Sequence, residues 1–194
     1  MRGMNEALPI SAHRWKRNPL DWYAEPDWCD EALFQQVTFT APIYDPACGL
    51  GRIVQAARRA GYDAFGTDIV SRSSYCVEER DFLDPLHTVC EVGCIVTNPP
   101  FKHAVAFAEK ALEVARNEVA FLLPARFLWG ATRSLWLAQT PLRRVLAIAP
   151  RPSMPPGELV ADGAKVGGGK EDFVWLIFER GYRGKPEFGW LRKS

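Results

Sequence analysis

Short apolar runs alternate with amphipathic segments along this chain from about Leu20 onward. The runs have the length and composition of buried strands, and they predict seven strands, at residues 43–45, 63–68, 76–82, 94–98, 118–124, 143–149 and 173–179. Segments with helical spacing or helix start signals lie at residues 26–34, 51–60, 102–117 and 130–139. This alternation predicts an α/β fold, doubly wound around a mainly parallel sheet that is covered on both faces.

Polar side chains stand where several of the predicted strands end. Asp45, Asp68, Asp81 and Asn98 each lie at or near the carboxyl end of an apolar run. In a parallel sheet these ends meet at one edge, and ligands bind in the crevice outside them. We therefore expect these four side chains to share one ligand site.

A glycine-containing loop, Asp45-Pro46-Ala47-Cys48-Gly49-Leu50-Gly51, connects a predicted strand to a predicted helix. Glycines let a ligand approach the backbone amides, so this order is typical of a nucleotide-type pocket, although an ordinary turn is the alternative. Asp68 follows at about the spacing of a ribose-binding carboxylate. A nicotinamide cofactor is not favoured, because Val54 replaces the third glycine of its fingerprint.

The tetrapeptide Asn98-Pro99-Pro100-Phe101 follows the predicted strand at 94–98. It offers an amide side chain, a carbonyl in a rigid turn and an aromatic ring, which together suit a planar amine. Such an amine is a poor nucleophile when its lone pair is delocalised into a ring. Hydrogen bonds to the Asn98 side-chain oxygen and the Pro99 carbonyl would direct that lone pair at a methyl group by positioning and electrostatics.

These motifs together resemble the amino-methyltransferases that use S-adenosylmethionine, and within them the adenine-specific (N6) DNA methyltransferases. The resemblance rests on DPACGLG at 45–51, TDI at 67–69, RDFLD at 80–84 and NPPF at 98–101. It implies a class I, Rossmann-like fold whose seventh and final strand is antiparallel. The activity that it implies is methyl transfer from S-adenosylmethionine to the 6-amino group of adenine in DNA.

The resemblance also implies residue roles. The catalytic loop would be Asn98, Pro99, Pro100 and Phe101, with Phe101 stacked on a target base that is flipped out of a duplex. The implied cofactor-binding residues are Tyr23, Glu25, Pro26, Asp45, Ala47, Cys48, Gly49, Gly51, Asp68, Ile69, Asp81, Phe82 and Asn98. We expect Phe101, Lys102, Arg126 and Arg151 to contact the substrate. Ordinary solvated surface is the alternative interpretation of the two arginines.

Cysteine usage favours neither a disulfide framework nor a metal site. Five cysteines without an apolar leader favour reduced thiols and a cytoplasmic setting, and no run is long enough to span a membrane. Cys76, Cys90 and Cys94, with His87 nearby in the sequence, fit no zinc spacing, so no metal is expected. Cys48 is expected to pack rather than to act as a nucleophile.

The chain has 194 residues, 47% of them hydrophobic, which suits a single core. We expect an N-terminal arm at 1–20, one domain at 21–194, and a flexible, substrate-facing loop at 151–170. No large insertion follows the NPPF sequence, so no separate recognition domain is expected, which resembles compact phage-type methyltransferases. Trp129 and Trp136, seven residues apart on a predicted helix, are expected on one face in a core or oligomer contact.

The partner is expected to be a nucleic acid, with DNA favoured, and the sequence leaves the oligomeric state open. A formal net charge of +1 gives no general attraction to phosphate, so any attraction must be local. Three alternatives remain: the same chemistry on adenine in RNA, the same chemistry on a protein glutamine amide, and a non-catalytic nucleic-acid-binding module of this fold.

Overall fold

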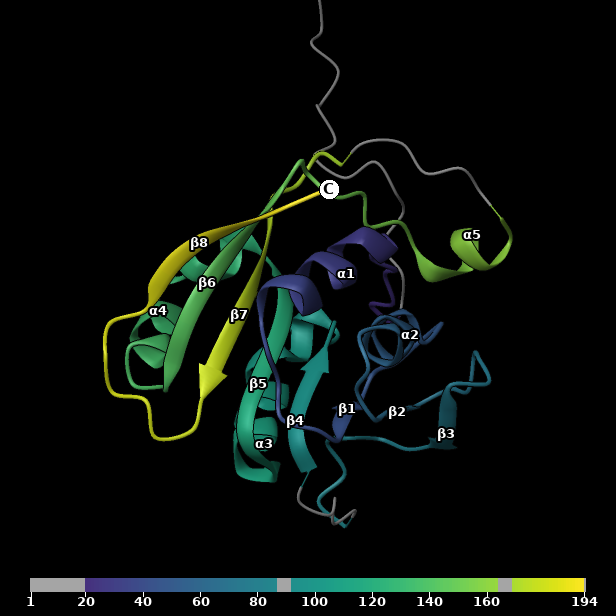
Figure 1. Ribbon diagram of the computed structural model, residues 1–194, viewed down its shortest axis with the longest axis horizontal. Helices are drawn as coiled ribbons and strands as arrows, with labels where there is room; N and C mark the ends of the chain where they lie inside the picture. Colours follow the sequence, from purple (N-terminus) through teal and green to yellow (C-terminus); the bar gives the residue numbers. More distant parts are fainter. Residues whose placement is uncertain (1–19, 87–91, 164–168, 194) are drawn as a thin grey trace, which may run out of the picture.

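The computed structural model describes residues 20–86, 92–163 and 169–193, and they form an eight-stranded sheet with helices on both faces (Figure 1). The strands are β1 (Ile43–Asp45), β2 (Ala64–Asp68), β3 (Cys76–Glu79), β4 (Val92–Thr97), β5 (Ala115–Pro124), β6 (Leu142–Ala149), β7 (Phe173–Glu179) and β8 (Glu187–Arg192). The α-helices are α1 (Asp27–Gln36), α2 (Arg52–Arg59), α3 (Ala104–Val114), α4 (Ala131–Leu137) and α5 (Gly157–Ala161). The expected arm at 1–20 lies, except for Leu20, outside the described residues.

The strand order is β3-β2-β1-β4-β5-β7-β6-β8. Neighbouring strands from β3 to β5 are parallel, β7 is antiparallel to both β5 and β6, and β8 is parallel to β6. The predicted mainly parallel sheet is therefore confirmed, and so is the antiparallel direction of the strand at 173–179. This strand is not the final one, because β8 follows it along the chain, and it is inserted between β5 and β6.

Two sequence-based boundaries also need correction. The sheet has eight strands rather than seven, because Glu187–Arg192 forms an additional edge strand. Within it only Leu191 is buried, so the segment lacks the continuous apolar run by which the other strands were predicted. In addition, residues 115–117 begin β5 instead of ending the preceding helix, since Ala115 pairs with Val92 of β4.

Each face of the sheet has its own apolar core. Helices α1 and α2 cover one face, where Leu33 and Ile53 pack in a cluster with Trp175. Helices α3 and α4 cover the other, where Phe107 packs in a cluster with Phe178. None of the described helices is long and apolar enough to cross a membrane. This double coverage leaves the carboxyl ends of the parallel strands as the open edge.

Candidate functional site

Two adjoining pockets lie at the carboxyl ends of β1, β2 and β4. The inner pocket is narrow, with a volume of about 280 Å³ including its open mouth, and it is lined by residues that include Glu25, Asp45, Gly49 and Asn98. The outer pocket, of about 900 Å³ including its open mouth, is lined by residues that include Asp68, Ile69, Asp81 and Asn98. Because β1 lies between β2 and β4, the strand-end residues converge as the sequence predicts. Asn98 is common to both pockets.

The loop after β1 is shaped by its two glycines. Gly49 and Gly51 have φ angles of 47° and 76°, which are unfavourable for other residues. A Cβ atom on Gly49 would lie 2.7 Å from the indole nitrogen of Trp22. The Gly49 amide donates a 2.8 Å hydrogen bond to Oδ2 of Asp68. The loop therefore closely approaches both Trp22 and the end of β2.

Buried carboxylates dominate the inner pocket. Asp45 is 1% exposed, and its Oδ1 accepts a 3.1 Å hydrogen bond from the Ala47 amide. Burial raises the pKa of Asp45 to about 8, and burial is also the main reason why the pKa of Glu25 is raised. No ion pair to Asp45 occurs among the described residues. A buried carboxyl group in this situation favours a cationic ligand over an anionic one.

The Asn98 side chain is held by the segment that precedes α1. Its Nδ2 donates to the Tyr23 carbonyl at 2.9 Å and to Oε2 of Glu25 at 2.7 Å. An asparagine amide has two N–H donors and one acceptor oxygen, so these bonds use both donors. The described residues provide no donor to Oδ1 of Asn98, which leaves this oxygen as the acceptor that Asn98 presents.

The segment 21–25 is fixed on several sides. Asp21, at a left-handed φ of 56°, accepts a 3.0 Å hydrogen bond from the Lys102 amide. The Ala24 amide donates to the Pro155 carbonyl, and the Gly157 amide donates to the Trp22 carbonyl. Part of the loop expected at 151–170 is thus anchored on this segment and continues into α5. Its role toward a substrate stays a prediction.

The outer pocket contains several of the expected cofactor-binding residues, among them Asp68, Asp81 and Phe82. Asp68 is 6% exposed, and its Oδ1 accepts a 2.6 Å bond from Arg72. The guanidinium of Arg72 also lies 4.3 Å from the centre of the Trp22 ring. Asp81 is exposed, whereas Phe82 is only 1% exposed and belongs to the core below the pocket. Phe82 therefore offers little surface to a ligand.

The predicted substrate contacts fall into two groups. Phe101 is half-buried, stacked parallel to Tyr23 at a centroid distance of 5.9 Å, and Lys102 lines the outer pocket. Arg126 and Arg151 line neither pocket. Arg126 forms an ion pair with Glu171, and Arg151 forms one with Asp172 at 2.7 Å. The second group lies beyond the crevice, toward β7 and β6.

Sequence reasoning assigned no role to Asp21 or Arg72, which both line the outer pocket. Asp21 contacts a residue 81 positions away, which leaves no local pattern. Arg72 pairs with Asp68 across a turn, at an i, i+4 spacing that also occurs on ordinary surfaces.

Cys48 is 5% exposed and burial raises its pKa, which suits a packing residue. Within the described residues, no group of three or more side chains could hold a metal ion.

Neither the protein-family models nor the curated protein sequences give a match to this chain. Solved structures do. The methyltransferase subunit of a type I restriction-modification system from Streptococcus thermophilus has a TM-score of 0.62 and 12% identity, over 91% of this chain and 48% of that one. The type I restriction enzyme EcoKI M protein has a TM-score of 0.59 and 14% identity, over 83% and 44% of the two chains.

A third similar structure is magnesium protoporphyrin IX methyltransferase from Synechocystis with bound S-adenosylmethionine, at a TM-score of 0.51 and 11% identity, over 79% of each chain. Together with the strand order, these likenesses show that the chain has the class I S-adenosylmethionine-dependent methyltransferase fold. The chain spans less than half the length of the two restriction-modification proteins.

Proposed function

We propose that this protein transfers a methyl group from S-adenosylmethionine to the exocyclic 6-amino group of adenine in DNA. One observation carries the proposal: Asn98 stands where the two pockets meet, with both amide hydrogens bonded and its oxygen left to accept. A group so oriented can accept a hydrogen bond from a target amine. The NPPF sequence, which resembles the catalytic loop of the adenine-specific enzymes, supports adenine as the target.

The residues present fit S-adenosylmethionine. The inner pocket, with buried Asp45 and Glu25, suits the methionine end of the molecule, whose ammonium group is a cation. The outer pocket suits the adenosine end, with Asp68 toward the ribose and Ile69 and Asp81 toward the adenine. When bound, the cofactor supplies a methyl group activated by a positively charged sulfur. Gly49 lines the inner pocket, and its lack of a side chain lets the backbone approach Trp22 closely.

The chain itself contributes orientation. Asn98 Oδ1 and the Pro99 carbonyl would accept the two hydrogens of the adenine amine, which directs the nitrogen lone pair away from the ring plane. Phe101 would stack on the base, and its present contact with Tyr23 fixes the plane available for stacking. Positioning and electrostatics of this kind are sufficient for a reaction that needs no covalent enzyme intermediate.

The test is methyl transfer to DNA, read by mass spectrometry of the digested nucleosides. Protein incubated with S-adenosylmethionine and plasmid DNA is expected to form 6-methyladenine. Asn98→Ala should lower the rate by at least about 100-fold, the usual cost of losing one group that stabilises a transition state. Asn117→Ala, which changes an exposed asparagine in β5, is the matched control and should retain full activity.

Parallel reactions with RNA and with a glutamine-containing peptide separate the alternatives. Methylation of either one in preference to DNA would overturn the assignment of the substrate and would leave the assignment of the cofactor unchanged. Equal DNA methylation by Asn98→Ala and Asn117→Ala would overturn the catalytic role of Asn98.

A further inference from the structure

Cationic and aromatic side chains, most of them exposed, gather beyond the crevice at the ends of β5, β7, β6 and β8. We call this surface the basic edge and define it by Arg126, Trp129, Arg133, Arg151, Lys170, Trp190, Arg192 and Lys193. Strands β5, β6 and β8 end here and β7 begins here, since β7 is antiparallel to its neighbours. The Lys193 amide donates to the Ala149 carbonyl at 3.0 Å, which fixes the end of β8 beside the end of β6.

The basic edge has more cationic than anionic groups. Its two acids, Glu171 and Asp172, are paired with Arg126 and Arg151. Arg133 instead donates to backbone carbonyls, which leaves its charge without a carboxylate partner among the described residues. The exposed side chains of Lys170, Arg192 and Lys193 likewise form no ion pair with any other residue that the structure describes. On a protein of net charge +1, this is a local attraction for phosphate.

Two tryptophans expose their rings on this surface. Trp129 is 79% exposed and Trp190 is 52% exposed, whereas the other described tryptophans are buried or half-buried. The expectation that Trp129 shares a helix face with Trp136 is wrong. Trp129 ends the 3₁₀ helix η2 (Ala125–Trp129), while Trp136 of α4 packs on Phe127 and Phe178.

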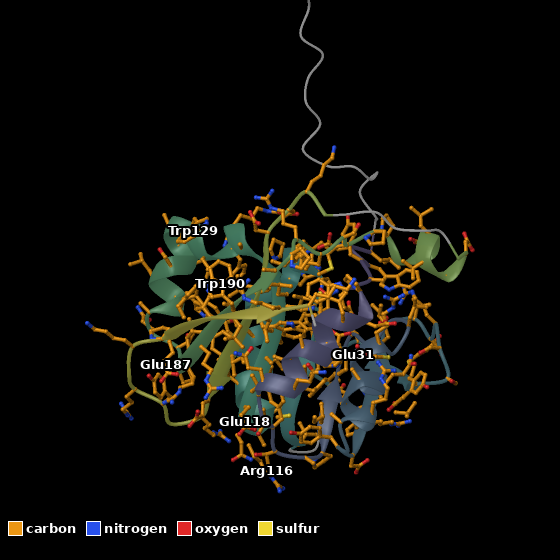
Figure 2. All side chains as sticks on the ribbon, turned by 45° about the horizontal axis from the view of Figure 1, so that its top comes forward. Glu31, Arg116, Glu118, Trp129, Glu187 and Trp190 are labelled. Carbon is orange, nitrogen blue, oxygen red and sulfur yellow. The ribbon has the colours of Figure 1, made fainter. Side chains whose placement is uncertain are left out.

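The exposed tryptophans lie on one side of the sheet. Leu191 packs in the cluster of the α1 face, so its neighbour Trp190 points to the opposite, α4 face. Figure 2 shows Trp129 and Trp190 in the same part of the view, with Arg116 and Glu118 at the far end of the molecule. Cations interleaved with exposed aromatic rings are the chemistry of nucleic-acid strand binding.

We propose that the basic edge binds the phosphodiester backbone of the DNA strand that flanks the target nucleotide, and that Trp129 stacks on an unpaired base of that strand. This inference rests on the proposed function. From β4, which ends just before Asn98, to β8 there are four strand spacings, or about 19 Å. At about 3.4 Å per phosphate along one strand, the edge could follow about six nucleotides of a duplex.

The experiment measures binding of a fluorescent 20-residue oligonucleotide, as a duplex and as a single strand, over a salt series. The variant R192A/K193A removes two charges from the basic edge. The control R183A/K185A removes two exposed charges from the turn between β7 and β8 at the opposite edge. We expect R192A/K193A to weaken binding about tenfold and to reduce the slope of log affinity against log salt by about 1 to 2. The control should match the wild type.

A second pair of variants tests the aromatic part. Trp129→Ala should weaken single-strand binding about tenfold without changing the salt slope, since stacking releases no counterions. Leu135→Ala, which truncates a side chain of α4 that is 69% exposed, is the matched control and should have no effect. All four variants change exposed side chains, and equal melting temperatures would show that the fold is retained.

The outcomes separate this inference from the proposed function, because adenine methylation is measured on the same samples. If the wild type methylates DNA but R192A/K193A binds the oligonucleotide as tightly as R183A/K185A does, the basic edge is not the DNA-binding surface, and the proposed function is unaffected. If R192A/K193A binds the oligonucleotide more weakly than the control but neither the wild type nor any variant forms 6-methyladenine, the basic edge is supported and the proposed function is wrong. A wild-type protein with no affinity for DNA would overturn the surface assignment.

Discussion

The inner and outer pockets meet at Asn98 but differ in the partners of their acids. The inner pocket has buried acids, with Glu25 and Asp45 exposed by only 6% and 1%. The outer pocket is open, with Ile69 exposed by 55%, and the oxygens of Asp68 are bonded to Gly49 and Arg72. The inner pocket thus holds two acids whose pKa is raised by burial, and Arg52, which also lines it, partly offsets this shift for Glu25. In the outer pocket both oxygens of Asp68 already accept hydrogen bonds, so a ribose bound there would have to replace one of these partners.

The largest effect should come from the acid that holds Asn98 in the inner pocket. Glu25→Ala removes one of the two acceptors for Asn98 Nδ2, and a hydrogen bond to a charged group is worth about 1.5–3 kcal/mol. We expect kcat to fall about 10- to 100-fold, as measured by steady-state methyl transfer. Glu25→Gln keeps an acceptor oxygen and should restore most of kcat. Equal losses in both variants would show that Glu25 does not act by orienting Asn98.

A smaller effect is expected for the other inner acid. Asp45→Asn removes the carboxylate that would face the cofactor ammonium, so affinity for S-adenosylmethionine should fall about tenfold by calorimetry. Relative to the wild type, Asp45→Asn should also stabilise the protein without ligand, and this gain in stability should be larger at high pH than at low pH. The folded protein keeps the Asp45 proton up to about pH 8, whereas an aspartate in the unfolded chain loses it at about pH 4. The free energy of unfolding of the wild type therefore decreases as the pH rises from the lower to the higher of these two values.

Thermal unfolding at pH 5 and pH 8 measures this second consequence. Asp45→Asn should gain melting temperature relative to the wild type at pH 8 and gain less at pH 5. The same difference between the two proteins at both pH values would mean that Asp45 is ionised in the empty protein.

The smallest effect belongs to the outer pocket. Arg72 occupies Oδ1 of Asp68, where the ribose hydroxyls would bind. Arg72→Ala removes this competitor, and we expect affinity for S-adenosylmethionine to rise by a few-fold, within the range of a single ion pair near the surface. Weaker binding by this variant would show instead that Arg72 stays in place and contacts the ligand.

The sequence predicted the parts of the site that depend on strand ends and local motifs. The loop from Asp45 to Gly51 and the tetrapeptide from Asn98 lie at the crevice because parallel strands end at one edge. It did not predict the bond between Asn98 and Glu25, which joins residues 73 positions apart. Contacts at such separations are set by tertiary packing, and no local periodicity encodes them.

The sequence did not predict the edge strand β8, for a different reason. A strand buried on both faces is a continuous apolar run, but an edge strand needs only a few inward residues. In β8, Leu191 is buried, whereas Phe188 and Trp190 are exposed by 65% and 52%. Strand β8 places Arg192 and Lys193 on the basic edge, four strand spacings away from β4.

A crystal structure with bound S-adenosylhomocysteine is the most direct measurement of how the two pockets work together. We expect the ligand to span both pockets, with its amino group beside Asp45, its ribose at Asp68 and its sulfur facing the side-chain oxygen of Asn98. A ligand confined to one pocket, or one whose sulfur is turned away from Asn98, would contradict the account.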